Sequence, residues 1–256
     1  MTALLLSALF PEADPSELAA VAHELGYDGI DLAVGGLPGA GDEHALALLA
    51  GEGAPALMLS LDTCLPAAVQ PWASLAAAAG CAALRLAPPP EDRPELTATI
   101  GELAALGAES GVRLLIPNHA GSLYPAPDGL AEALAGVDAA ALAALLAPDQ
   151  IPRSRAGDHV AWLTRLKLPP IGAVCLAGYR WESQIGAGNI RLWSPLPTLV
   201  GQSLTPWPAW LARLKDLAFD GLFTFGDAAL PAGAAERLRL ARDDLRFLRR
   251  YWLPRP

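Results

Sequence analysis

The strongest constraint on the fold is an alternation of short apolar runs with longer Ala/Leu-rich stretches that have helical spacing. The apolar runs are nearly continuously hydrophobic, as strands buried on both faces of a sheet are. A strand followed by a helix, repeated along the chain, is typical of βα units around a parallel sheet. We predict strands over residues 3–10, 29–34, 56–61, 82–87, 112–117, 142–147, 172–177 and 221–225.

A helical stretch follows each predicted strand, and the first shows its boundaries most clearly. Asp14 can cap this helix, Pro15 suits its first position, and Gly26 supplies a left-handed stop. The other helices are predicted over residues 44–51, 71–80, 94–111, 128–135, 157–168, 206–218 and 234–251. Eight strands, each followed by a helix, predict a single (β/α)8 TIM barrel domain spanning residues 1–256. The sixth unit fits least well, because residues 142–147 are rich enough in Ala and Leu to form a helix.

Composition argues against several classes of partner. The net charge is -9, from 18 Lys and Arg against 27 Asp and Glu, so we expect no nucleic-acid partner. No window of eighteen residues is apolar throughout, so we expect no membrane partner. The 3 Cys are widely spaced and form no CxxC pair, which fits a reducing cytoplasm rather than a disulfide framework or a zinc site. High usage of Ala, Gly, Pro and Arg is typical of a GC-rich bacterial genome.

Three segments resemble one known superfamily. They are ELAAVAHELGYDGIDL, GVRLLIPNHAGSLYPAPDGLAEAL and GQSLTPWPAWLARLKDLAFDGLFTFGD, and the resemblance runs from about residue 4 to residue 227. They are similar to xylose-isomerase-like TIM barrels, which include sugar phosphate isomerases and epimerases and relatives of endonuclease IV. The resemblance implies a TIM barrel with a carbohydrate-type ligand, whereas a fold by itself does not establish an activity.

The resemblance also implies a divalent metal held by carboxylates and His at the ends of strands. This chain departs from that pattern: where the family has Glu-Asn-His after the fifth strand, Pro117 stands first. The His-x-His-x-Lys-Asp pattern of the seventh strand reads AVCLAGYR here, and Gly226 replaces the Glu of the eighth strand. Asp149 and Asp227 are the acidic residues left near the expected ligand positions. We therefore predict that the metal is absent and that no other cofactor is used.

Polar residues at the predicted strand ends are the candidates for chemistry, because the active sites of TIM barrels lie at that face. His119 can exchange a proton near neutral pH, or it can be a hydrogen-bonded loop residue. Asp149, Glu182 and Asp227 are the other candidates for proton transfer. Asn118 is a candidate for binding substrate or for a structural role rather than for chemistry.

Further residues are candidates for substrate binding. Arg85 can bind a carboxylate or phosphate, or it can form a buried pair with Asp31 or Asp62. Asp31 then either faces the substrate or pairs with an Arg. Tyr179, Arg180 and Trp193 follow the seventh strand in a long segment that we expect to be irregular and to cross the barrel mouth.

Two functional classes remain open. The first is a divergent, metal-independent sugar or sugar phosphate isomerase or epimerase that acts on a small polar ligand. The second is a non-catalytic protein that kept the barrel and serves in ligand binding or scaffolding. The missing metal ligands favour the second class, and the remaining His and the charged, aromatic segment favour an occupied pocket.

Overall fold

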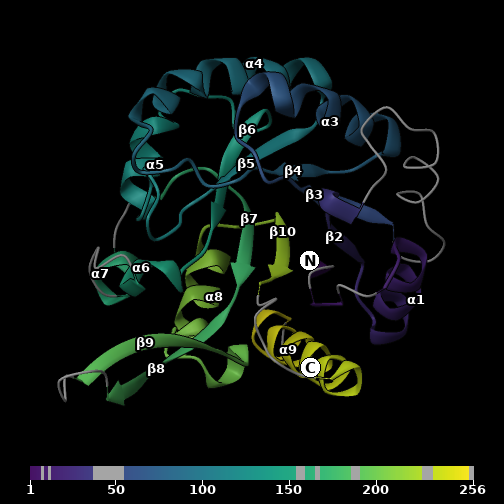
Figure 1. Cartoon of the computed structure of the whole chain (residues 1–256), viewed down its shortest axis with the longest axis vertical. Coiled ribbons are helices and arrows are strands. Elements are labelled where there is room, and N and C mark those ends of the chain that lie inside the picture. Colours follow the sequence, from purple (N-terminus) through teal and green to yellow (C-terminus); the bar gives the residue numbers. More distant parts are fainter. Residues whose placement is uncertain are drawn as a thin grey trace.

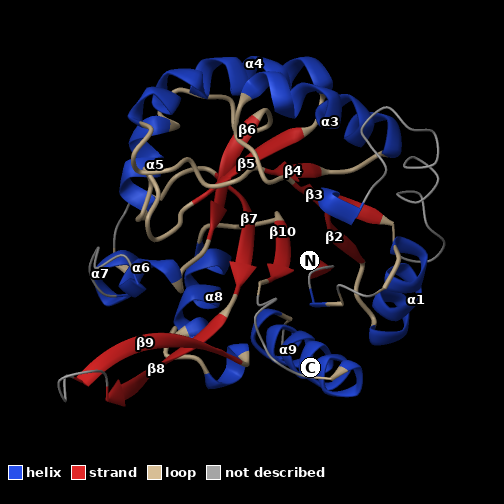
Figure 2. Ribbon diagram, in the orientation of Figure 1, coloured by secondary structure: helices blue, strands red, loops and turns tan. Residues whose placement is uncertain are grey.

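The computed structural model describes residues 1–6, 9–10, 13–36, 55–153, 159–164, 168–185, 191–226 and 233–253. Within them, eight parallel strands close into a barrel in the order β1-β10-β7-β6-β5-β4-β3-β2, which confirms the predicted TIM barrel (Figure 2). The predicted helix over residues 44–51 lies outside the described residues, as does Asp227. The barrel strands are β1 (Thr2–Leu6), β2 (Gly29–Ala33), β3 (Ala56–Ser60), β4 (Ala83–Arg85), β5 (Arg113–Pro117), β6 (Leu142–Leu146), β7 (Ile171–Leu176) and β10 (Leu222–Phe225).

The helices lie outside the strands (Figure 1). They are α1 (Pro15–Leu25), α3 (Pro66–Ala79), α4 (Ile100–Ser110), α5 (Pro127–Ala133), α6 (Gln150–Arg153), α7 (His159–Leu163), α8 (Trp207–Asp216) and α9 (Ala234–Trp252), with 3-10 turns η2 (Val34–Gly36), η3 (Pro94–Thr99) and η5 (Val200–Gln202). Helix α1 begins and ends as predicted: the Asp14 side chain accepts from the Glu17 N–H, and Gly26 is left-handed at φ 86°. No helix in the described part of the chain is long and apolar enough to cross a membrane.

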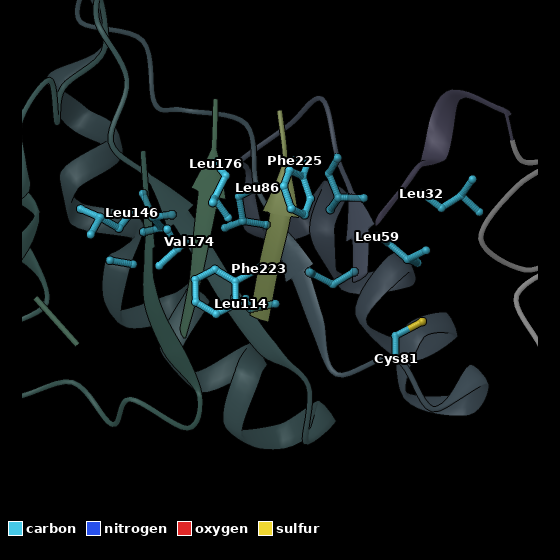
Figure 3. Packing of buried hydrophobic residues seen from close by; sticks show 14 of the residues in the cluster. Leu32, Leu59, Cys81, Leu86, Leu114, Leu146, Val174, Leu176, Phe223 and Phe225 are labelled. Atoms are coloured by element: carbon cyan, nitrogen blue, oxygen red, sulfur yellow. The ribbon is translucent and has the colours of Figure 1, made fainter. Parts of the chain in front are cut away.

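Side chains alternate along the strands between two apolar layers. Those pointing outward, such as Val174 and Leu176 on β7 or Phe223 and Phe225 on β10, pack in the layer between strands and helices (Figure 3). Those pointing inward form a second cluster inside the barrel, made of Leu4, Met58, Ala83, Leu115, Ala143, Leu145, Ala147, Ala173 and Cys175. Because the side-chain period of a strand is two, this alternation fixes which polar residues face the barrel interior.

The segment after β7 differs from its prediction. It is not irregular: β8 (Gly178–Ile185) pairs antiparallel with β9 (Arg191–Thr198) in a separate two-stranded hairpin. The hairpin extends away from the barrel strands (Figure 1). At its base the two backbones approach so closely that a Cβ on Gly178 would lie 2.2 Å from the carbonyl oxygen of Thr198. Apolar and polar residues alternate in β8, whereas Pro195 and Pro197 in β9 argue against a strand and so against the prediction of a hairpin.

Candidate functional site

A cavity of about 660 Å³ opens at the carboxyl ends of the barrel strands. Its size suits a small ligand. Its wall is largely apolar, with a few polar side chains from different strand ends. The lining residues are Ala33, Val34, Gly35, Ser60, Leu61, Asp62, Arg85, Leu86, Ala87, Pro88, Pro117, Asn118, His119, Leu145, Ala147, Asp149, Gln150, Arg153, Cys175, Ala177 and Gly226.

A buried polar network lies beneath this cavity, centred on Asp31. The Asp31 carboxylate is fully buried and accepts hydrogen bonds from the hydroxyls of Ser60 on β3 and Thr224 on β10, the latter at 2.7 Å. Nη1 of Arg85 on β4 lies 3.6 Å from Oδ2 of Asp31, and the Arg85 side chain is 28% exposed. Of the two roles that the sequence leaves open for Asp31, the structure shows the ion pair. Part of the Arg85 side chain remains accessible, and Arg85 also lines the cavity.

Asn118 connects the end of β5 to the end of β6. Its Oδ1 accepts from the Ala147 N–H at 2.7 Å, and its Nδ2 donates to the Ala147 carbonyl at 2.9 Å. Asn118 is 1% exposed, so both polar ends of its side chain are satisfied by one buried backbone unit. This double hydrogen bond fixes the chain just before Asp149, which is the structural role considered for Asn118 above.

Asp149 and Arg153 form a charged pair on one turn of helix. Nη1 of Arg153 lies 3.7 Å from Oδ2 of Asp149, and the same oxygen accepts from Nε2 of Gln150 at 2.7 Å. Burial raises the pKa of Asp149, and the charges of Arg153 and Arg85 oppose that shift in part. The other carboxylate oxygen, Oδ1, is buried and has no hydrogen-bond partner within the described structure. The Arg153 guanidinium also lies over the Tyr179 ring, 5.2 Å from its centroid.

His119 stands at the exposed rim of the cavity. Partial burial of the imidazole lowers its pKa, and the positive charges of Arg153 and Arg85 lower it further, against a hydrogen bond with the Ala120 backbone. The imidazole is therefore neutral near pH 7 and can accept a proton. Both guanidinium groups act on His119 and on Asp149, so these four side chains belong to one electrostatic site.

The structure brings only part of the predicted set to the cavity. Asn118, His119, Asp149 and Arg85 line it, and Asp31 lies beneath it. Tyr179 is buried behind Arg153 rather than in the cavity wall, while Arg180, Glu182 and Trp193 stand on the hairpin and are not among the lining residues.

Sequence reasoning missed two members of the site, Gln150 and Arg153. They fall in a segment, residues 147–158, that reads as a loop, whereas residues 150–153 form helix α6. The spacing of Asp149 and Arg153, four positions apart, was the available signal, because such a pair meets on one helical turn.

The described residues do not fit the divalent metal that the resemblance implies. The strand-end positions expected to carry ligands hold Pro117, Cys175 and Gly226, and all three line the cavity. No group of three His, Cys, Asp or Glu side chains in the described part of the chain is placed to hold an ion. A Cβ on Gly226 would lie 2.4 Å from Sγ of Cys175, so a carboxylate at this position would collide with the thiol.

Comparison with solved structures identifies the fold. No family model and no curated protein matches the sequence. D-psicose 3-epimerase with D-tagatose, from Clostridium cellulolyticum H10, superposes with a TM-score of 0.76 at 13% identity, covering 98% of this chain and 99% of that one. The probable 3-DHS dehydratase AsbF involved in petrobactin synthesis, from Bacillus anthracis, gives 0.70 at 15% identity, covering 97% and 98%.

A third solved structure is a xylose isomerase-like TIM barrel protein from Mycobacterium smegmatis in complex with magnesium. It superposes with a TM-score of 0.71 at 14% identity, covering 98% of this chain and 96% of that chain. At such identities the likeness shows the fold and leaves the chemistry to the site itself. The chain therefore has the fold of the xylose-isomerase-like TIM barrels.

Proposed function

We propose that the barrel mouth binds a small anionic carbohydrate derivative, such as a sugar phosphate or a sugar acid. The observation that carries this proposal is the pair of arginines, Arg85 and Arg153, in the wall of one cavity. Among the described residues, each arginine pairs with one carboxylate, at 3.6 Å and 3.7 Å, and a guanidinium has five N–H donors, more than one such pair uses. A guanidinium binds carboxylate and phosphate oxygens through paired hydrogen bonds. The solved structures of similar fold include a sugar epimerase, which supports a carbohydrate ligand.

The reaction that suits these groups is proton transfer at a carbon next to a carbonyl, as in an isomerase or epimerase. Neutral His119 would remove the proton, and the electron pair of the broken C–H bond would move onto the carbonyl oxygen. The guanidinium of Arg85 or Arg153 would stabilise the negative charge on that oxygen. Asp149, whose pKa is raised, is the second group able to hold and return a proton. Return of the proton to the opposite face of the same carbon gives epimerisation, and return to the neighbouring carbon gives isomerisation.

A non-catalytic binding protein is the second candidate. The observation that favours it is the set Pro117, Cys175 and Gly226 at the positions where the family's ligands are expected. Such a protein would use the same arginines to hold the ligand and would not turn it over.

Binding is tested by calorimetric titration with glucose 6-phosphate, glucuronate and uncharged glucose. We expect the two anions to bind and glucose to bind far more weakly. Arg153→Lys and Arg85→Lys keep the charges but lose the forked geometry, and each should weaken anion binding about 10-fold to 100-fold. Arg246→Lys is the matched control, because the Arg246 side chain is 71% exposed on α9 and does not line the cavity. Equal binding of glucose and the anions, or unchanged affinity in both cavity variants, would contradict the proposal.

Turnover separates the two candidates. NMR in D2O follows exchange of the hydrogen on the carbon next to the carbonyl of a bound ketose phosphate such as fructose 6-phosphate. If the wild type catalyses this exchange and His119→Gln does not, while the ligand affinities of the two differ by no more than a few-fold, the protein is an enzyme. Binding without exchange in the wild type identifies the non-catalytic protein.

A further inference from the structure

A second cavity lies beside the barrel mouth. This groove has a volume of about 470 Å³ and is lined by Pro152, Arg153, Trp181 and Trp193. Arg153 also lines the mouth cavity, so its side chain borders both spaces. The groove is thus walled on one side by α6 and on the other by the hairpin of β8 and β9, which the proposed function leaves unused.

The register of the hairpin puts its aromatic residues on one face. Trp181 is opposite Pro195 and Trp193 is opposite Ser183, so the two indoles are two positions apart along the ladder and on the same side. Tyr179 precedes them on that face and packs edge-on against Trp181, with ring centroids 6.0 Å apart. This face therefore runs from the buried Tyr179 next to Arg153 to the exposed indoles.

Exposure along this face rises with distance from the barrel. Tyr179 is 2% exposed, Trp181 is 39% exposed and Trp193 is 59% exposed. Large aromatic side chains usually bury most of their surface on folding, and gathered exposed ones mark sites of binding. The groove therefore offers two flat apolar surfaces next to a guanidinium, within reach of the mouth.

We propose that the groove is a subsite for a second sugar ring, so that the ligand is an acidic disaccharide or glycoside rather than a single sugar. This inference rests on the proposed function. The acidic ring would lie in the mouth near Arg85, and the second ring would lay its apolar C–H face on Trp193 and Trp181. Arg153, shared by both spaces, would donate to oxygens near the bond that joins the rings.

The volumes favour a ligand of two rings. The mouth by itself, at about 660 Å³, already has room for a monosaccharide, and the groove adds a separate space of comparable size. A flat indole binds any ring with an apolar face, and the donors of Arg153 add the polar contacts that hydroxyl groups need.

The test compares two acids that differ by one ring, glucuronate and cellobiouronic acid, in calorimetric titrations. Trp193→Ala should weaken binding of cellobiouronic acid about 5-fold to 30-fold and leave glucuronate unchanged, because only the second ring would lose the apolar surface of the indole. Ile185→Ala is the matched control: Ile185 is on the same hairpin face and 72% exposed, but it does not line the groove. Arg85→Lys should weaken both acids.

Three other results would contradict the subsite, and one of them would contradict the proposed function as well. If the wild type binds glucuronate through Arg85 but binds cellobiouronic acid no more tightly, the subsite is wrong and the proposed function stands. If neither acid binds, the proposed function fails and the subsite fails with it. If Trp193→Ala converts a dimer to a monomer in sedimentation experiments without changing either affinity, the groove is an interface between two copies of the chain.

Discussion

Replacement of Asn118 by alanine tests how the cavity is held together. The substitution removes the two hydrogen bonds, of 2.7 Å and 2.9 Å, between this side chain and the Ala147 backbone. Ala147 is 6% exposed, so its N–H would be left unpaired in a buried place, whereas its carbonyl would keep the hydrogen bond from the Gln150 N–H at 3.1 Å. The unpaired N–H costs about 1–3 kcal/mol, and the lost bond to the carbonyl costs about 0.5–1.5 kcal/mol more. We therefore expect Asn118→Ala to lower the free energy of unfolding by about 2–4 kcal/mol, and Tm by about 4–16 °C.

The assay is urea unfolding followed by circular dichroism, with the slope of the transition checked against the wild type. Asn118→Asp is the informative companion, since a carboxylate cannot donate to the Ala147 carbonyl whereas a protonated carboxyl can. Burial beside a carbonyl raises the pKa of this new carboxyl above its unfolded value, so the variant should be most destabilised at pH 7 and recover as pH falls toward 4. A loss below about 1 kcal/mol for Asn118→Ala, with an unchanged slope, would refute the assigned role.

Three further predictions concern other parts of the fold. Burial raises the pKa of Asp244 to about 7. The contribution of this carboxyl to stability is therefore present below its unfolded pKa and is lost as pH rises toward 7. Asp244→Asn should flatten this pH dependence of the free energy of unfolding, measured by urea unfolding at several pH values. Gly178→Ala would place a Cβ 2.2 Å from the Thr198 carbonyl oxygen, so limited proteolysis should cut the hairpin faster than in the wild type. Gly226→Ala, with a Cβ 2.4 Å from Sγ of Cys175, should destabilise by about 1–3 kcal/mol, and Cys175→Ala in the same chain should restore most of that loss.

The barrel could be predicted from the sequence because each of its units is local. Short apolar runs, helical spacing and the Asp14 and Gly26 caps each lie within a dozen residues of one another. The Ala/Leu-rich sixth strand shows the limit of local reasoning, because residues 142–146 are a strand only through pairing with β5 and β7. Tertiary pairing there overrides helix propensity.

Only some residues of the site could be placed from the sequence. Asp31 and Arg85 could be placed near each other because both are polar residues in apolar strands that need a partner. Arg153 could not be placed in the site from the sequence, because its position depends on a single turn of helix and on the ring of Tyr179 on the hairpin. The hairpin was missed for a related reason: its two strands pair with each other rather than with the barrel, and Pro195 and Pro197 in β9 argue against a strand.

The most direct test of the central claim is to locate an anion in the barrel mouth. Crystals of the wild type soaked in tungstate, which mimics phosphate and scatters anomalously, would show where a tetrahedral anion binds. The account predicts an anomalous peak within hydrogen-bond distance of the guanidinium groups of both Arg85 and Arg153, lost in Arg153→Lys crystals treated alike. An empty mouth in wild-type crystals whose surface sites carry tungstate would contradict it.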